Sequence, residues 1–158
     1  MNTGILGITT IIVLCGLATI ASAQEIKRTV DQPTDPISLV VAVPPGYTIY
    51  YISGEIGKPV TPAADGKPAD WGNTTQETRS VLDTLKQTMS KAGLTFGDVV
   101  KATVYMAPSI DFAEMNKVWK TEFGTSAQPN RPARAAIHIT SMGSVGPQLE
   151  IEFIAAKK

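Results

Sequence analysis

The sequence predicts an α+β domain in which a mixed β-sheet carries two helices packed on one face. Two segments have apolar residues at helical spacing, and several short segments alternate as strands do. A long stretch rich in Pro and Gly separates the first strong strand from the first helix. The resulting order is strand, loop, helix, strand, helix, strand, strand, which is typical of a sheet with its helices on a single side.

The first strong strand covers Thr48–Ser53 and is apolar on both faces. Ile49 and Tyr51 share one face, whereas Tyr50 and Ile52 share the other. A strand that is apolar on both faces needs cover on both. Because the two helices cover one face, we expect another copy of the chain to cover the second.

A loop and a helix follow this strand. Lys58–Asn73 contains three prolines and two glycines, which predicts a surface loop. Thr74 and Glu77 have the spacing of a capping box, so we expect the helix to begin there and to end at Gly93. Its apolar residues at helical spacing are Val81, Leu82, Leu85 and Met89.

The remaining elements are, in order, a strand, a helix and two further strands. Val99–Met106 alternates as a strand, and Asp111–Phe123 has the period of a helix that stops at Gly124. Arg134–Thr140 and Leu149–Ala155 are the last two strands. The apolar stripe of the second helix consists of Phe112, Met115, Trp119 and Phe123, which we expect in the core.

The N-terminus has the features of a cleavable signal peptide. Ile5–Ile20 is almost wholly apolar, and Ala21–Ala23 before Gln24 matches the small-x-small form of a signal peptidase site. The run is shorter than the ~20 residues that span a bilayer, which favours cleavage over a permanent anchor. Leu14 precedes Cys15 where a lipoprotein site needs a small residue. We therefore expect residues 1–23 to be removed and the protein to be periplasmic or secreted.

The rest of the chain is expected to form one domain over residues 37–158, preceded by a polar, flexible segment over residues 24–36. The formal net charge is 0, so the sequence shows no excess of positive charge for binding nucleic acid. Cys15, the single cysteine, lies in the predicted signal, so no disulfide is expected. His138 has no second histidine to join it in a metal site, and we expect neither metal nor cofactor.

Two charges in apolar strands are the strongest functional signal. Arg134 and Glu150 each lie among apolar neighbours, where a charge is costly unless something pairs with it. Arg134 could bind the carboxylate of a substrate through two parallel hydrogen bonds from its planar guanidinium, or form a salt bridge with a neighbouring subunit. A carboxyl group in the last strand could activate water and move a proton, and Glu150 and Glu152 share one strand face. His138 is a possible base, although a lone strand histidine is more often structural.

Five segments carry a further signal, and they occur in the order Ile52–Ile56, Ala92–Lys101, Asp111–Asn116, Pro132–Met142 and Leu149–Ile151. Together they resemble the Rid family of reactive intermediate deaminases, also called the YjgF family. The resemblance spans roughly Ile49–Ala155 and implies a chorismate-mutase-like fold, a homotrimer with ligand clefts between subunits, and no cofactor. It also implies hydrolysis of reactive enamines and 2-imino acids to 2-keto acids and ammonia.

The resemblance also implies a role for individual residues. Arg134 would hold the substrate carboxylate, and Glu150 would be the acid/base group. Whether these two meet within one subunit or across an interface is left open by the sequence. The residues that would shape the cleft are Ser53, Gly54, Asn116 and Ala136, the last of which stands where many family members have Cys.

One departure supports an alternative function. Family deaminases typically carry a Gly-Pro-Tyr segment near the mature N-terminus, but Ile37–Val40 stands in that region, and Val40 cannot donate a hydrogen bond. Thr140 also differs from the residues usual at its position. The alternative is a non-catalytic trimer that binds small carboxylates or acts as a chaperone. Retention of Glu150 favours the enzyme, because binding a carboxylate needs only Arg134. An endoribonuclease activity is disfavoured by the zero net charge.

We predict that the exported protein begins at or near Gln24, because the apolar run ends in a small-residue cleavage site. Intact-mass measurement of the protein from the periplasm or the medium checks this. Recovery of the full chain from the membrane fraction would contradict the prediction.

Overall fold

The main sheet has four strands in the order β3-β6-β4-β5 in the computed structural model, which describes residues 24–158. The predicted signal peptide lies outside the described residues. β6 runs antiparallel to β3 and β4, while β5 is parallel to β4, so the predicted mixed sheet is confirmed. The strands are β3 (Thr48–Ile56), β4 (Val99–Met106), β5 (Ala133–His138) and β6 (Leu149–Lys157).

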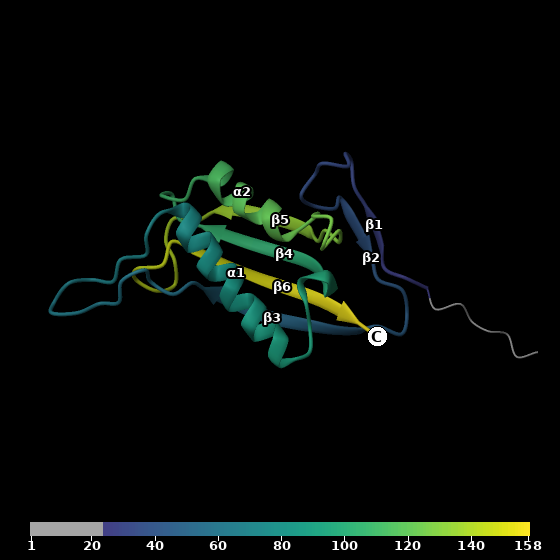
Figure 1. The fold of residues 1–158 in the computed structure, drawn as a ribbon, viewed down its shortest axis with the longest axis horizontal. Coiled ribbons are helices and arrows are strands. Elements are labelled where there is room, and N and C mark those ends of the chain that lie inside the picture. The colour runs from purple at the N-terminus through teal and green to yellow at the C-terminus, as the bar shows by residue number, and fades with distance from the viewer. Residues whose placement is uncertain (1–23) are drawn as a thin grey trace, which may run out of the picture.

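Both helices cover the same face of this sheet (Figure 1), as the α+β prediction required. They are α1 (Thr74–Lys91) and α2 (Phe112–Glu122), and the 3-10 turn η1 (Phe96–Asp98) leads into β4. Compared with the expected strands, β5 ends two residues earlier, at His138, and β3 extends to Ile56. Within residues 24–158, no helix combines the length and the apolar character that crossing a membrane requires.

The segment expected to be a flexible arm takes part in a second, two-stranded sheet. β1 (Lys27–Thr29) pairs antiparallel with β2 (Val40–Ala42). The side chain of Arg28 donates hydrogen bonds to the carbonyls of Gly97 at 3.3 Å and Val99 at 3.2 Å, which ties β1 to the start of β4. A cation that reaches two backbone acceptors explains why this polar segment is attached to the main sheet.

The start of α1 differs from the predicted capping box. Asn73, not Thr74, is the N-cap, and its side chain accepts from the backbone N–H of Gln76 at 3.0 Å. The Gln76 side chain accepts in return from the N–H of Asn73 at 3.0 Å. Glu77, which was expected to complete the cap, is instead only 2% exposed and points toward the start of β6.

The core lies between the helices and the sheet and contains an aromatic cluster. Trp119 stacks on Phe123 with ring centroids 4.3 Å apart, and Phe153 of β6 meets Trp119, Phe123 and Phe96 edge to face. The predicted α1 stripe is buried, and Trp119 is fully buried as expected. Phe112 was expected in the core with it but is 46% exposed, as the first residue of α2.

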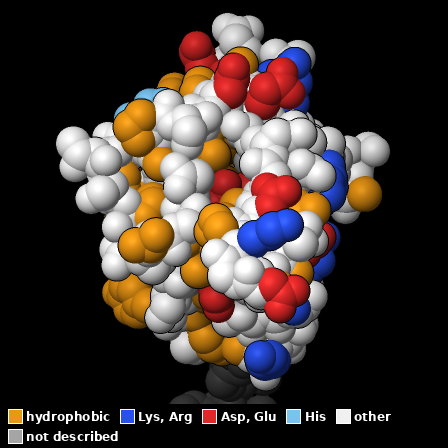
Figure 2. Space-filling model, turned by 90° about the vertical axis from the view of Figure 1, so that its left-hand side faces the viewer, with side chains coloured by type: hydrophobic (Ala, Val, Ile, Leu, Met, Phe, Trp, Pro, Cys, Tyr) orange, Lys and Arg blue, Asp and Glu red, His pale blue; other side chains and the backbone are white. Residues whose placement is uncertain are grey.

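The opposite face of the sheet is open and partly apolar. Tyr50 and Ile52 pack against the core, so Ile49 and Tyr51 point away from it, and Tyr51 is 81% exposed. Ile137 of β5 is also exposed. Hydrophobic side chains gather on one side of the molecule in Figure 2, whereas most charged side chains lie on the other. This segregation agrees with the expectation that a strand apolar on both faces needs a second cover.

Phe153→Ala should lower the free energy of unfolding by about 3–5 kcal/mol, because it removes the ring that contacts the other members of the aromatic cluster. Urea unfolding followed by circular dichroism measures the change. Gln87→Ala on the exposed side of α1 is the control and should stay within about 0.5 kcal/mol of the parent. Equal losses in the two variants would contradict this view of the core.

Candidate functional site

Arg134 points to the helix side of the sheet, where it contacts α2. Its β4 partner in the parallel register is the core residue Ala102. The Arg134 Nη2 donates a hydrogen bond to Asn116 Oδ1 at 2.9 Å. The guanidinium carbon lies 4.6 Å from the ring centroid of Trp119 and 5.9 Å from that of Phe112. We call Arg134 and the three residues that its guanidinium contacts, which are Asn116, Trp119 and Phe112, the arginine half-site.

The charge of Arg134 is only partly satisfied in this environment. Burial lowers its pKa to about 10, so the guanidinium remains protonated at neutral pH. Its Nη1 is buried and finds no acceptor among the described residues, and neither salt bridge in residues 24–158 involves Arg134. A buried cationic donor without an acceptor is costly. The arrangement therefore suits an incoming anion such as a carboxylate.

Glu150 lies on the other face of the sheet, against β3. Its neighbours Leu149 and Ile151 are fully buried in the core, so the Glu150 side chain points to the open face. A Cβ atom at Gly54 would overlap the carboxylate oxygen Oε1 of Glu150. Only glycine therefore lets this carboxylate lie against the strand.

The β3 backbone is irregular at this point. The pairing with β6 shifts between Ile52 and Glu55, and the residues between them are Ser53 and Gly54, both exposed. Such an irregularity redirects side chains at the edge of a sheet. We call Glu150, Ser53 and Gly54 the glutamate half-site.

The two half-sites do not meet within one chain. Arg134 is level with Ala102 and Phe153 across the sheet, whereas Glu150 is level with Tyr105, three residues away along β4. Because three is an odd number, the two side chains point to opposite faces. The question that the sequence left open is thus answered for the single chain.

The other predicted residues have plainer environments. Ala136 packs against the core two residues after Arg134. His138 Nδ1 lies 3.3 Å from the carbonyl oxygen of Ala107, which supports its structural interpretation. The Tyr105 hydroxyl donates to Glu152 at 3.4 Å, and burial, with Glu152 as the next cause, raises the pKa of Tyr105 and keeps its proton in place.

The segment that replaces the family tyrosine lies along the start of β5. The N–H of Ser38 donates to the carbonyl of Pro132 at 2.9 Å, and the Ser38 hydroxyl donates to that of Arg131 at 2.7 Å. Leu39 and Val40, which follow, are both exposed. Two apolar side chains therefore face solvent close to the strand that bears Arg134.

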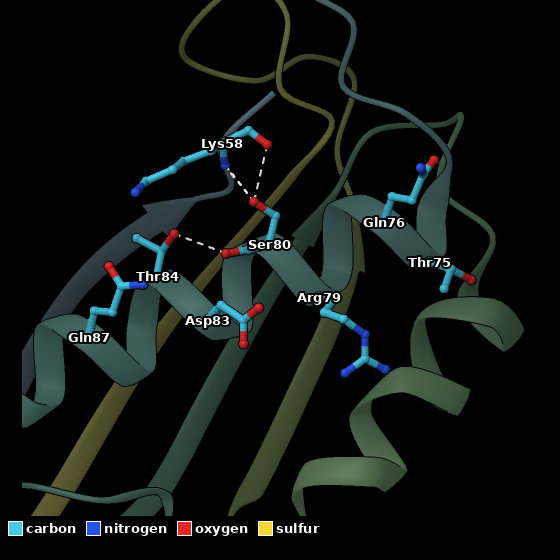
Figure 3. Close-up of a pocket in the computed structure, with 8 residues that line it drawn as sticks. All are labelled: Lys58, Thr75, Gln76, Arg79, Ser80, Asp83, Thr84 and Gln87. Atoms are coloured by element: carbon cyan, nitrogen blue, oxygen red, sulfur yellow. Dashed lines mark hydrogen bonds between the residues drawn. The ribbon is translucent and has the colours of Figure 1, made fainter. Parts of the chain in front are cut away.

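Two of the surface hollows lie away from both half-sites. A hollow of about 440 Å³ runs along the outer side of α1, with polar side chains such as Arg79 and Asp83 around it (Figure 3). Another, of about 650 Å³, lies beside Phe96, Glu122 and Gln128. Neither is lined by Arg134 or Glu150. Among residues 24–158, no three His, Cys, Asp or Glu side chains gather in a group that could hold a metal ion.

One residue near the glutamate half-site was missed by the sequence analysis. The Glu77 side chain accepts hydrogen bonds from the backbone N–H groups of Gln148, which directly precedes β6, and of Leu149, the first residue of β6. Its spacing of four residues from Val81 and eight from Leu85 places it on the buried stripe of α1. That spacing was visible in the sequence, and a charge on an apolar stripe indicates a specific partner.

The chain is similar to known proteins in sequence and in fold. The chain is 39% identical over 107 residues to a RutC family protein of Haemophilus influenzae, covering 67% of this chain and 77% of that protein. It is 36% identical over 107 residues to the 2-iminobutanoate/2-iminopropanoate deaminase of Rattus norvegicus, covering 68% and 72%. The crystal structure of Escherichia coli TdcF with bound serine superposes with a TM-score of 0.55 at 30% identity, covering 84% of this chain and 100% of that one.

A family model described as endoribonuclease L-PSP matches residues 25–157. The match covers both half-sites and the two helices. The chain therefore belongs to the endoribonuclease L-PSP family, which is the Rid or YjgF family that its motifs resemble.

Proposed function

We propose that the protein is an imine deaminase that hydrolyses 2-imino acids to 2-keto acids and ammonia. The observation that carries this proposal is the presence of both half-sites: a partly buried guanidinium whose Nη1 has no acceptor among the described residues, and a carboxylate that lies against Gly54. The relatives named as 2-iminobutanoate/2-iminopropanoate deaminases support the same reaction class.

In this proposal the complete site forms between two copies of the chain. The arginine half-site and the glutamate half-site lie on opposite faces of the sheet, so one chain cannot bring them to the same substrate. A cyclic homotrimer would cover each open face and bring the glutamate half-site of one copy to the arginine half-site of the next. The exposed Tyr51 and Ile137 are suited to burial at such an interface.

The reaction needs one anion anchor and one proton carrier. Arg134 would bind the substrate carboxylate, with Asn116 holding the guanidinium in place. Glu150 would accept a proton from water as the water oxygen bonds to the imine carbon, and the electron pair of the C=N bond would move to nitrogen. Glu150 would then return that proton to nitrogen, which gives a carbinolamine. In the last step Glu150 would pass the proton of the carbinolamine hydroxyl to the amino group, which leaves as ammonia with the C–N electron pair while the C=O bond of the keto acid forms.

The second candidate is a trimer that binds small carboxylates without turnover. It is favoured by Val40, an exposed apolar residue in the region where family deaminases carry a tyrosine. A coupled assay separates the two functions: an amino-acid oxidase generates imino acids, and ammonia release is timed with and without the protein. Acceleration supports the deaminase, and an unchanged rate with measurable carboxylate binding supports the binding protein. We further propose that the protein acts outside the cytoplasm, as its N-terminal sequence suggests.

The mature chain should be a homotrimer at micromolar concentration, because the open face of the sheet exposes apolar side chains. Light scattering coupled to size-exclusion chromatography gives the mass. Tyr51→Glu should shift the mass toward that of a monomer, whereas Gln87→Glu on the outer side of α1 should not. A stable parent monomer would remove the proposed intersubunit site.

Arg134→Ala should abolish carboxylate binding and turnover, because it removes the anion anchor. Glu150→Gln should keep most of the binding but lose turnover by about 100-fold or more, because an amide cannot accept and return a proton. Calorimetry with a 2-keto acid and the coupled assay measure the two properties. Glu152→Gln is the control on the same strand face and should behave like the parent.

Mixing these inactive variants tests the intersubunit geometry. When Arg134→Ala and Glu150→Gln chains are unfolded together and refolded, some sites receive the intact Arg134 of one copy and the intact Glu150 of another. Random assembly should restore roughly one quarter of the parent activity. No recovery from well-formed mixed trimers would show that the two residues do not act across an interface.

A further inference from the structure

Glu77 is a buried carboxylate that holds the start of β6. Its side chain leaves the first turns of α1 and crosses to the sheet, where only 2% of the residue is exposed. Oε1 accepts hydrogen bonds from the backbone N–H groups of Gln148 at 2.5 Å and Leu149 at 3.1 Å. One oxygen atom of a helix side chain thus fixes two consecutive peptide groups.

The rest of Gln148 is held equally firmly. Its carbonyl accepts from the N–H of Ala107 at 2.8 Å, and its side-chain oxygen accepts from the Ser109 hydroxyl at 2.8 Å. Its side-chain nitrogen donates to the carbonyl of Gly146 at 2.8 Å. The polar groups of Gln148 are therefore all engaged, and the bonds that Glu77 accepts are the ones that attach this junction to α1.

The carboxylate occupies this place at a cost. Neither salt bridge among the described residues involves Glu77, and burial raises its pKa, although the two N–H groups act in the opposite direction. An apolar side chain of similar volume would avoid that cost but would leave both N–H groups without their acceptor. The contribution of the carboxylate is therefore to the position of the β6 backbone.

The position of this backbone decides where Glu150 lies. Leu149, whose N–H is held by Glu77, directly precedes Glu150 and is fully buried. On the other face, the Glu150 carboxylate is pressed against Gly54 with no room for even a methyl group. A small shift of the first β6 peptides would therefore displace the carboxylate from the glutamate half-site.

We propose that Glu77 is a positioning residue for Glu150: by fixing the backbone N–H groups of Gln148 and Leu149, where β6 begins, it places the Glu150 carboxylate where it meets the substrate. This inference rests on the proposed function, because it takes Glu150 as the acid/base group. It goes beyond that function by assigning a role to a helix residue that cannot contact the substrate.

Two substitutions of similar size test the proposal. Glu77→Met fills the same space without an acceptor and should lower kcat by about 10- to 100-fold, because small misplacements of a catalytic group are costly. KM, and the affinity for a 2-keto acid product, should stay within about twofold, because Arg134 is untouched. Glu77→Gln keeps an oxygen acceptor and should restore kcat to within about threefold of the parent.

Thr78→Val is the matched control. Thr78 is also buried in α1, but its hydroxyl bonds only to the carbonyl of Thr74 in the same helix. This variant should change the midpoint of thermal unfolding and leave kcat unchanged. A parent-like kcat in Glu77→Met, or equal losses in Glu77→Met and Glu77→Gln, would overturn the proposal.

A readout without turnover separates this proposal from the proposed function. The carbon-13 chemical shift of the Glu150 carboxyl carbon reports its surroundings against Gly54, and it should change in Glu77→Met and not in Thr78→Val. An unchanged chemical shift in Glu77→Met would overturn the positioning role. If the parent protein fails to accelerate ammonia release, the deaminase function is wrong, and the chemical shift still decides whether Glu77 positions Glu150. If Glu77→Met does not fold, Glu77→Asp withdraws the acceptor by one methylene, and a parent-like chemical shift there would equally overturn the proposal.

Discussion

The alternation of side chains across a β-strand separates the two charges on which the proposed chemistry depends. Arg134 and Glu150 belong to strands of the same sheet, but their register sends one to the helix face and the other to the open face. Each charge has its own surroundings: aromatic rings and an amide for Arg134, a glycine and an irregular strand for Glu150. A substrate that touches both must lie between two copies of the chain. The proposed chemistry therefore depends on assembly of the chain into an oligomer.

Two buried groups, one in the arginine half-site and one beside the glutamate half-site, are costly in isolation. Among residues 24–158, Nη1 of Arg134 is a buried donor without an acceptor, and the buried Glu77 takes part in no salt bridge. The aromatic core beneath Arg134 and the hydrogen bonds around Gln148 hold these groups in single positions. The stability of the core therefore serves the geometry of the site, because a loosely packed core would let each charge relax toward water.

The family to which the chain belongs carries the description endoribonuclease L-PSP, yet the features of this protein suit a small carboxylate better than RNA. The formal net charge is 0, and Arg134 lies between Trp119 and the strand, not on a basic surface. Relatives of this chain are named 2-iminobutanoate/2-iminopropanoate deaminase, a name that describes an activity on small molecules. The exposed Leu39 and Val40 stand in the region where family deaminases carry a tyrosine, directly after the residue that pairs with the start of β5.

The sequence by itself determined the elements of the main sheet, both helices and the core, because hydrophobic periodicity is a local property of the chain. It also singled out Arg134, Glu150, Gly54 and Asn116 as candidate site residues, since a charge in an apolar strand and a family motif are both visible without coordinates. Only the tertiary structure decided that Arg134 meets Asn116 and that Glu150 lies on Gly54, because strand order and register are set by contacts between distant segments. The role of Glu77 shows the same limit. Its local spacing suggested that it would pair with Thr74 in a capping box, but Asn73 and Gln76 form that box. The two backbone N–H groups that bind Glu77 lie more than seventy residues away along the chain.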